Sequence, residues 1–118
     1  MKNFKTFSGL LNYVKKDLME NNSFDLVEEH TCIELVESTT AKIITQYALD
    51  NINLSHKECD ILWNKHYGMY SYCNSKNDIK VQLLIDALDY NLIGEKMTVA
   101  QMKRKALKES QQEGKIFP

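Results

Sequence analysis

Apolar side chains recur every three or four residues along most of the chain, and this spacing constrains its fold more than any other feature. Near the N-terminus the steps of three and four place five such residues on one helix face: Phe4, Phe7, Leu11, Val14 and Leu18. Only four glycines and one proline occur in 118 residues, which disfavours a fold built from many tight turns. The sequence therefore predicts an all-α bundle.

Four segments farther along begin with a sequence typical of a helix N-terminus. A small hydroxyl side chain is followed three residues later by an acid or amide, so that each can bond the other residue's backbone amide. These capping sequences occupy residues 31–34, 55–58, 75–78 and 98–101. Together with a first helix over about residues 4–20, they predict about five helices in one domain, 1–118.

The helix that begins after Thr31 contains an interruption. Apolar residues continue at helical spacing from Ile33 to Tyr47, but residues 38–40 read Ser-Thr-Thr, which is unfavourable inside a helix. Two outcomes are open, a break in the helix or a short strand through Ile43 and Ile44. Residues 24–29 are a further candidate for a separate helical turn.

The C-terminal third resembles a helix-turn-helix. The resemblance covers about 35 residues, from the helix expected over 79–93 to the one that begins at Thr98, and it implies DNA binding by the second helix. The end of the second helix, 106–116, is similar to a winged-helix recognition helix where the chain turns into the wing. Lys103 and Ser110 depart from the pattern, because such helices bury aliphatic residues there.

Glycine gives a further indication of where helices end. Gly94 and Gly114 follow the apolar patterns of the last two helices. Helices often end at a residue in the left-handed conformation, which glycine adopts at little cost. Both glycines are therefore expected at helix C-termini.

The net charge of −1 conceals a strong asymmetry along the chain. Residues 1–16 carry +4, residues 17–60 carry −8, residues 61–94 balance, and residues 95–118 carry +3. Separated charge of this kind can attract an oppositely charged partner. It can equally be neutralised within the fold, if the basic ends pack beside the acidic middle.

An aromatic series offers a second recognition surface. Trp63, Tyr67 and Tyr70 fall at positions i, i+4 and i+7, and the ordinary interpretation is a stripe in the core. The same helix has three further large apolar residues to bury, so part of the aromatic series is expected to stay exposed, as in binding hot spots. The predicted protein-binding residues are these three aromatics together with Glu34 and Glu37.

The last helix, about 98–113, separates an apolar stripe from a basic face. The stripe consists of Val99, Met102, Ala106 and Ser110. One interpretation is a docked helix with a solvated basic face. The other is contact with phosphates and bases of DNA, through Gln101, Arg104, Lys105, Lys108 and Gln112.

Metal binding and catalysis are not expected. His30 and Cys32, with His56 and Cys59, offer four zinc-type ligands, but neither spacing is that of a standard zinc site. Scattered histidines and cysteines are the preferred interpretation, so neither a metal nor a cofactor is predicted. The sequence also has no phosphate-binding glycine loop, no His-Glu-x-x-His and no Gly-x-Ser-x-Gly, and it is predicted not to be an enzyme.

The remaining features suggest a cytoplasmic protein with a macromolecular partner. No apolar run exceeds three residues, no secretory signal follows the basic start, and the three cysteines are an odd number, which fits reduced thiols. The predicted function is a non-enzymatic regulatory or interaction protein, an adaptor, inhibitor or accessory subunit. It would bind another protein through the acidic surface 17–60 and the aromatic helix face. The alternative is a small, dimeric DNA-binding protein that uses helix 98–113.

Overall fold

The computed structural model describes residues 2–21, 27, 29–64 and 70–116, of which residues 112–116 are described by their backbone alone. Within these residues the chain forms helices and no strand, which confirms the all-α prediction. The six helices are α1 (Phe7–Glu20), α2 (Cys32–Leu35), α3 (Ser38–Asn51), α4 (His56–Leu62), α5 (Lys76–Leu92) and α6 (Val99–Ile116).

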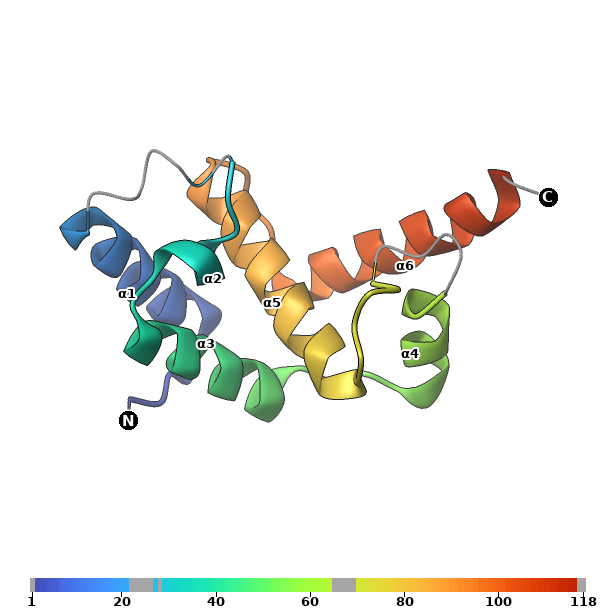
Figure 1. The fold of residues 1–118 in the computed structure, drawn as a ribbon, viewed down its shortest axis with the longest axis horizontal. Helices are drawn as coiled ribbons and strands as arrows, with labels where there is room; N and C mark the ends of the chain where they lie inside the picture. Colours follow the sequence, from blue (N-terminus) through green and yellow to red (C-terminus); the bar gives the residue numbers. More distant parts are fainter. Residues whose placement is uncertain (1, 22–26, 28, 65–69, 117–118) are drawn as a thin grey trace.

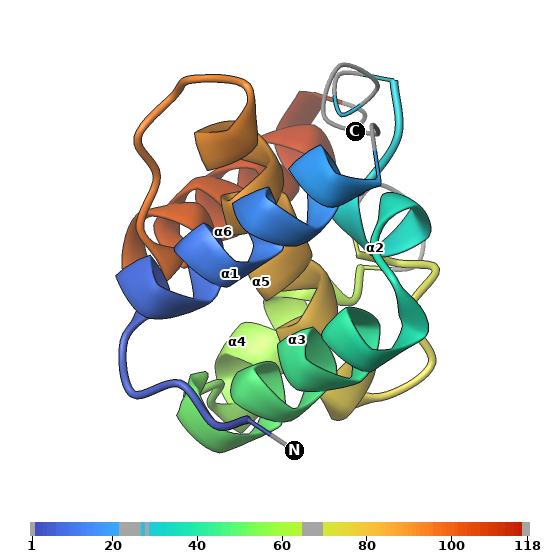
Figure 2. The same ribbon diagram turned by 90° about the vertical axis from the view of Figure 1, so that its left-hand side faces the viewer.

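Helix α5 is the centre of the molecule. It packs against α1, α2, α3, α4 and α6, and Figure 1 shows it crossing between them. Figure 2, which looks along the long axis, shows α1 and α3 on the near side of α5. This placement follows from the sequence of α5, because apolar residues occupy most of its circumference. Its buried residues are Ile79, Leu83, Leu84, Ile85, Ala87, Leu88 and Leu92.

The capping sequences begin helices as predicted. In 55–58 the serine Oγ accepts from the glutamate amide at 3.1 Å, and the glutamate side chain accepts from the serine amide at 2.9 Å. The same reciprocal pair in 98–101 spans 3.0 and 2.9 Å. In 75–78 the serine accepts from the aspartate amide at 3.1 Å, while that aspartate side chain accepts from the backbone amide of Asn74. In 31–34 the glutamate accepts from the threonine amide at 3.3 Å.

The helix breaks at residues 36–37, just before the Ser-Thr-Thr segment, and residues 38–40 form the first turn of the next helix. Helix α2 ends at Leu35, and Glu37 takes an extended conformation with ψ 156° before α3 begins at Ser38. The Glu37 backbone amide donates to Asp17 Oδ2 at 3.0 Å, which fastens the break to α1. The strand considered through Ile43 and Ile44 is wrong, because both are buried residues within α3.

The remaining predicted boundaries have different outcomes. Helix α1 begins at Phe7 rather than near residue 4, since Thr6 caps it by accepting from the Gly9 amide at 3.1 Å. Gly94 has φ 98°, as predicted for a helix end. Gly114 does not end α6, which continues to Ile116. The turn considered for 24–29 falls mostly outside the described residues.

Lys103 shows why the C-terminal pair departs from the helix-turn-helix pattern. Helix α6 packs against both α5 and α4, and Lys103 faces α4. Its Nζ lies 3.1 Å from Glu58 Oε2 and donates to the carbonyl of Asn53 at 3.1 Å. A half-buried ion pair thus occupies the position at which helix-turn-helix proteins bury an aliphatic residue.

Candidate functional site

One stripe of α5 is not filled by core side chains. This stripe consists of residues at positions i, i+4, i+7 and i+11, which lie on one face of a helix. They are Gln82, Asp86, Asp89 and Ile93, the residue that follows α5. Three of them line a hollow of about 420 Å³, which we call the acidic hollow. Its described lining comes from the segment before α2, from α5 with the residue after it, and from α6: Val27, Glu29, His30, Thr31, Asp86, Asp89, Tyr90, Ile93 and Met102.

Asp89 joins the acidic hollow to helix α2. Its Oδ1 accepts a hydrogen bond from the backbone amide of Cys32 at 2.7 Å, so the carboxylate caps the first residue of α2. Burial raises the pKa of Asp89 to about 6, and the bond from Cys32 offsets only part of this effect. The charges that act on Asp89 come from Asp86 and Glu34, and both raise its pKa further because they are negative.

Asp86 is held by two neutral donors. Tyr70 donates from its hydroxyl to Oδ2 at 2.7 Å, and Gln82 donates from Nε2 to Oδ1 at 2.8 Å. Burial raises the pKa of Asp86, while the bonds from Tyr70 and Gln82 act in the opposite direction. Neither donor brings a positive charge to this carboxylate.

The acidic hollow has no lysine or arginine among its described lining residues. Its one basic group there is His30, whose Nδ1 lies 3.7 Å from Glu34 Oε2. Lys105 lies nearby on α6, with its Nζ 5.9 Å from the centre of the Tyr90 ring, but its charge is paired with Glu109. Two partly buried carboxylates therefore share a largely apolar hollow whose described lining contains no lysine or arginine, and its histidine lies beside Glu34.

The predicted acidic and aromatic contact residues do not form one surface. Glu34 lies close enough to the acidic hollow for its charge to act on Asp89, and Glu37 follows it at the start of α3. Trp63 caps the C-terminus of α4 with 40% of its surface exposed. Helices α2 and α4 lie toward opposite ends of the long axis (Figure 1).

Of the other two aromatic residues of the series, only Tyr70 belongs to the described part of the chain. Tyr70 is 1% exposed and bonds to Asp86, so it belongs to the core rather than to a binding face. Tyr67 lies outside the described residues. The helix expected to carry the series, α4, is only seven residues long and ends at Leu62.

The predicted DNA-contact residues are only partly free to bind. Gln101 uses its Oε1 to cap α6, and Lys105 pairs with Glu109. Arg104 and Lys108 are exposed on the outer face of α6. The Gln112 side chain lies outside the described residues.

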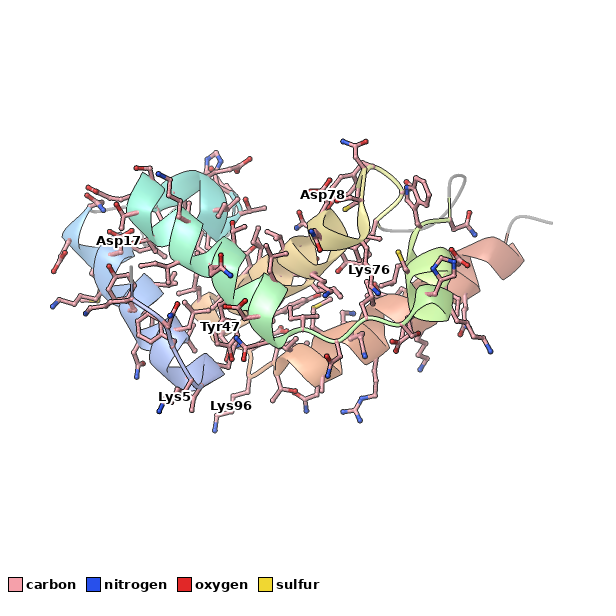
Figure 3. The ribbon with its side chains drawn as sticks, turned by 90° about the horizontal axis from the view of Figure 1, so that it is seen from below. Lys5, Asp17, Tyr47, Lys76, Asp78 and Lys96 are labelled. Carbon is pink, nitrogen blue, oxygen red and sulfur yellow. The ribbon has the colours of Figure 1, made fainter. Side chains whose placement is uncertain are left out.

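Other basic residues lie away from α6. Lys5 and Lys96 are exposed and extend from the body of the molecule at one edge (Figure 3). The basic charge of the two chain ends is therefore not gathered on one helix face.

The four zinc-type ligands are not brought together. His30 and Cys32 lie at α2, whereas His56 and Cys59 lie on α4, toward the opposite end of the molecule (Figure 1). Among the described residues, no group of three or more histidines, cysteines or acids is placed to share a metal ion. Burial raises the pKa of the Cys32 thiol, and Asp89 raises it further, which keeps this cysteine protonated and unreactive.

Sequence reasoning missed Asp86 and Asp89. Their spacing on α5 is ordinary for a solvated helix face, and nothing local distinguishes them from exposed acids. The available signal was the breadth of the apolar surface of α5, which marks a helix enclosed by others and so an interior setting for its acids.

No helix in the described part of the chain combines the length and the apolar character needed to cross a membrane. Comparison of the chain with protein-family models, with curated proteins and with solved structures finds no match.

Proposed function

We propose that this chain is a non-enzymatic protein-interaction module that binds a basic segment of a protein partner at the acidic hollow and the adjoining surface of α2. The observation that carries the proposal is the setting of Asp86 and Asp89. Both carboxylates are partly buried, and all the hydrogen-bond partners that the described residues provide for them are neutral.

Burial makes these carboxylates strong attractors of a cation. A charge removed from water is costly unless it is paired, and its attraction to an opposite charge increases as the local dielectric falls. In the free chain, protonation relieves that cost for Asp89 only as the pH falls below its raised pKa of about 6. A basic partner would supply the missing counter-charge. Pairing with it would relieve the desolvation penalty of the buried carboxylates, and this relief would contribute to the free energy of binding.

The rim supports recognition of a macromolecule rather than of a small ion. Glu29 and Glu34 are exposed beside the acidic hollow and extend its negative field onto the surface. Ile93 is 44% exposed at the same place, which adds an apolar contact. Exposed apolar surface beside polar and charged groups is a combination found in protein-binding surfaces.

Photo-crosslinking tests the proposal. A photoreactive amino acid placed at Ile93 should crosslink one protein in a lysate of the source cells, through a peptide that contains lysine or arginine. The matched control is Met19 on α1, which is 66% exposed and lies outside the acidic hollow. Glu29→Gln combined with Glu34→Gln should reduce the crosslink from Ile93 several-fold. Equal crosslinking from both positions would contradict the proposal.

DNA binding through α6 is the alternative that the same preparation can test. Arg104 and Lys108 are exposed, so a DNA-binding chain should lose affinity when both are changed to glutamate, and its affinity should fall steeply with salt. The proposed function predicts no such salt-dependent binding to duplex DNA. Retention of DNA that is abolished by the two substitutions would favour the alternative.

A further inference from the structure

We infer that the group held in the acidic hollow is an arginine side chain of the partner, presented beside an apolar residue. The inference rests on the proposed function and names the chemistry of the bound segment.

The spacing of the two carboxylates favours a forked donor. Asp86 and Asp89 are three residues apart on α5, so they are neighbours on one face of the helix, with Cβ atoms about 5–6 Å apart. A guanidinium group carries five N–H donors in a planar fork and can bond two carboxylates at once. A lysine ammonium is a compact charge that cannot span the pair in the same way.

Both carboxylates keep the capacity to accept further hydrogen bonds. An ionised carboxylate has about four acceptor positions. Asp86 uses one position on each oxygen, for Tyr70 and for Gln82. Asp89 accepts hydrogen bonds from the backbone amide and the thiol of Cys32. Each carboxylate therefore keeps acceptor positions that these bonds do not use, and both carboxylates line the hollow.

The walls of the acidic hollow match the rest of an arginine side chain. Tyr90 lines it with an aromatic ring, the group on which a guanidinium stacks favourably, and this ring already attracts one cation, since Lys105 Nζ lies 5.9 Å from its centre. Val27 and Ile93 provide apolar surface for the methylene groups and for an apolar neighbour. Guanidinium is also less strongly hydrated than ammonium, so it loses less on entering a partly apolar site.

The volume of the acidic hollow is compatible with one side chain and its neighbour. Its volume of about 420 Å³ lies at the lower end of the range of about 300–1,000 Å³ that is typical of small-ligand clefts. A whole helix would not fit inside it. The bound segment is therefore expected to insert one residue and to lie across the rim.

An NMR titration of the ¹⁵N-labelled chain tests the inference with three blocked dipeptides. The probes are N-acetyl-Arg-Leu-amide, N-acetyl-Lys-Leu-amide and the citrulline analogue of the first, which has the same shape but no charge. The arginine probe should bind at least tenfold more tightly than the citrulline probe and several-fold more tightly than the lysine probe. The largest shifts should occur at the amides of Asp86, Asp89 and Ile93.

Two matched variants locate the site. Asp89→Asn keeps an oxygen that can accept from Cys32 and should weaken the arginine probe at least fivefold. Asp50→Asn, at an exposed position on α3, should leave the affinity unchanged. Should Asp89→Asn fail to fold, Glu34→Gln serves in its place, since Glu34 is exposed and its charge acts on Asp89; it should weaken the probe about twofold.

The outcomes separate this inference from the proposed function. Equal binding of the arginine and citrulline probes, or binding that is insensitive to both charge variants, would overturn the inference. If Ile93 still crosslinks a partner through a basic peptide without arginine, the proposed function survives and the arginine assignment fails. If no crosslink forms and no probe binds, both fail.

Discussion

Asp89 of α5 accepts a hydrogen bond of 2.7 Å from the backbone amide of Cys32, the first residue of α2. The same carboxylate lines the acidic hollow. One side chain therefore holds a short helix in place and also provides charge for a ligand. This double role explains why a partly buried acid without a basic partner is tolerated in the free chain.

Asp89→Asn should stabilise the chain at neutral pH. The asparagine oxygen still accepts from Cys32, but the buried charge is removed. The pKa of Asp89 is about 6 in the folded chain, whereas an unperturbed aspartate, as in the unfolded chain, has a pKa of 3.8. The folded state therefore binds the proton more tightly. Stability from this group is thus complete below pH 4 and is lost as the pH rises through 6.

Urea unfolding from pH 4 to pH 8 measures this difference. The variant should exceed the original chain by about 1 kcal/mol at pH 8, a value reduced for partial solvent screening. The unfolding free energies of the variant and the original chain should become equal near pH 4. Asp50→Asn, at an exposed position, should show no such pH-dependent difference. A constant gap between the original chain and Asp89→Asn at every pH would contradict the prediction.

Tyr70→Phe should destabilise the chain. The substitution removes the hydroxyl that donates to Asp86 Oδ2 at 2.7 Å and leaves a partly buried carboxylate with one donor fewer. The expected loss is about 1–2 kcal/mol in the free energy of unfolding. Tyr72→Phe, at an exposed tyrosine, is the control and should change stability by less than about 0.5 kcal/mol. Similar losses in both variants would disagree with the core role of Tyr70.

Lys103 and Glu58 should show energetic coupling between α6 and α4. Their side chains are both half-buried, and their charged atoms lie 3.1 Å apart. A double-mutant cycle with Lys103→Met and Glu58→Gln should give a coupling free energy of about 1 kcal/mol in unfolding. Lys108→Met, on the exposed face of the same helix, should show almost no coupling to Glu58→Gln. A value near zero for the Lys103 pair would mean that the contact does not stabilise the packing of α6.

Ser110→Ala should be neutral or stabilising. Ser110 is buried on the inner face of α6, and among the described residues its Oγ has no hydrogen-bond partner. Alanine removes the unsatisfied hydroxyl and has the higher helix propensity, which together predict a gain of about 0.5–1 kcal/mol. Thermal unfolding compared with Ser75→Ala, which removes an N-cap and should cost about 1 kcal/mol, gives the contrast. A loss of stability in Ser110→Ala would reveal a partner for this hydroxyl.

The helices and their starting points were predictable because local chemistry determines them. The serine and threonine caps at 55–58 and 98–101 act within four residues, and the apolar stripe of α6 buries Met102 and Ala106 as its spacing predicts. The break before Ser38 was open between two outcomes. The break is bonded to Asp17, a residue distant in the sequence, which accepts from the amide of Glu37, and local sequence does not reveal such a contact.

The candidate site was harder to predict because it depends on tertiary packing. Glu34 was identified from its charge, but Asp86 and Asp89 became unusual only when the segment before α2 and helix α6 enclosed their face of α5. Tyr70 was assigned to a surface because helical spacing was extended beyond Leu62, where α4 ends. Lys105 was predicted to contact DNA, and Lys103 was noted only as a departure from the helix-turn-helix pattern, yet acids at 109 and 58 pair with them.

The most direct test of the absence of a counter-charge in the acidic hollow is a carboxyl-carbon NMR titration of Asp89, with and without N-acetyl-Arg-Leu-amide. In the free chain Asp89 should titrate with a midpoint near 6. The arginine probe should lower that midpoint, and the citrulline analogue should leave it in place. A midpoint of 4 or below in the free chain, unchanged by the arginine probe, would show that the charge is already neutralised and would contradict the proposed binding site.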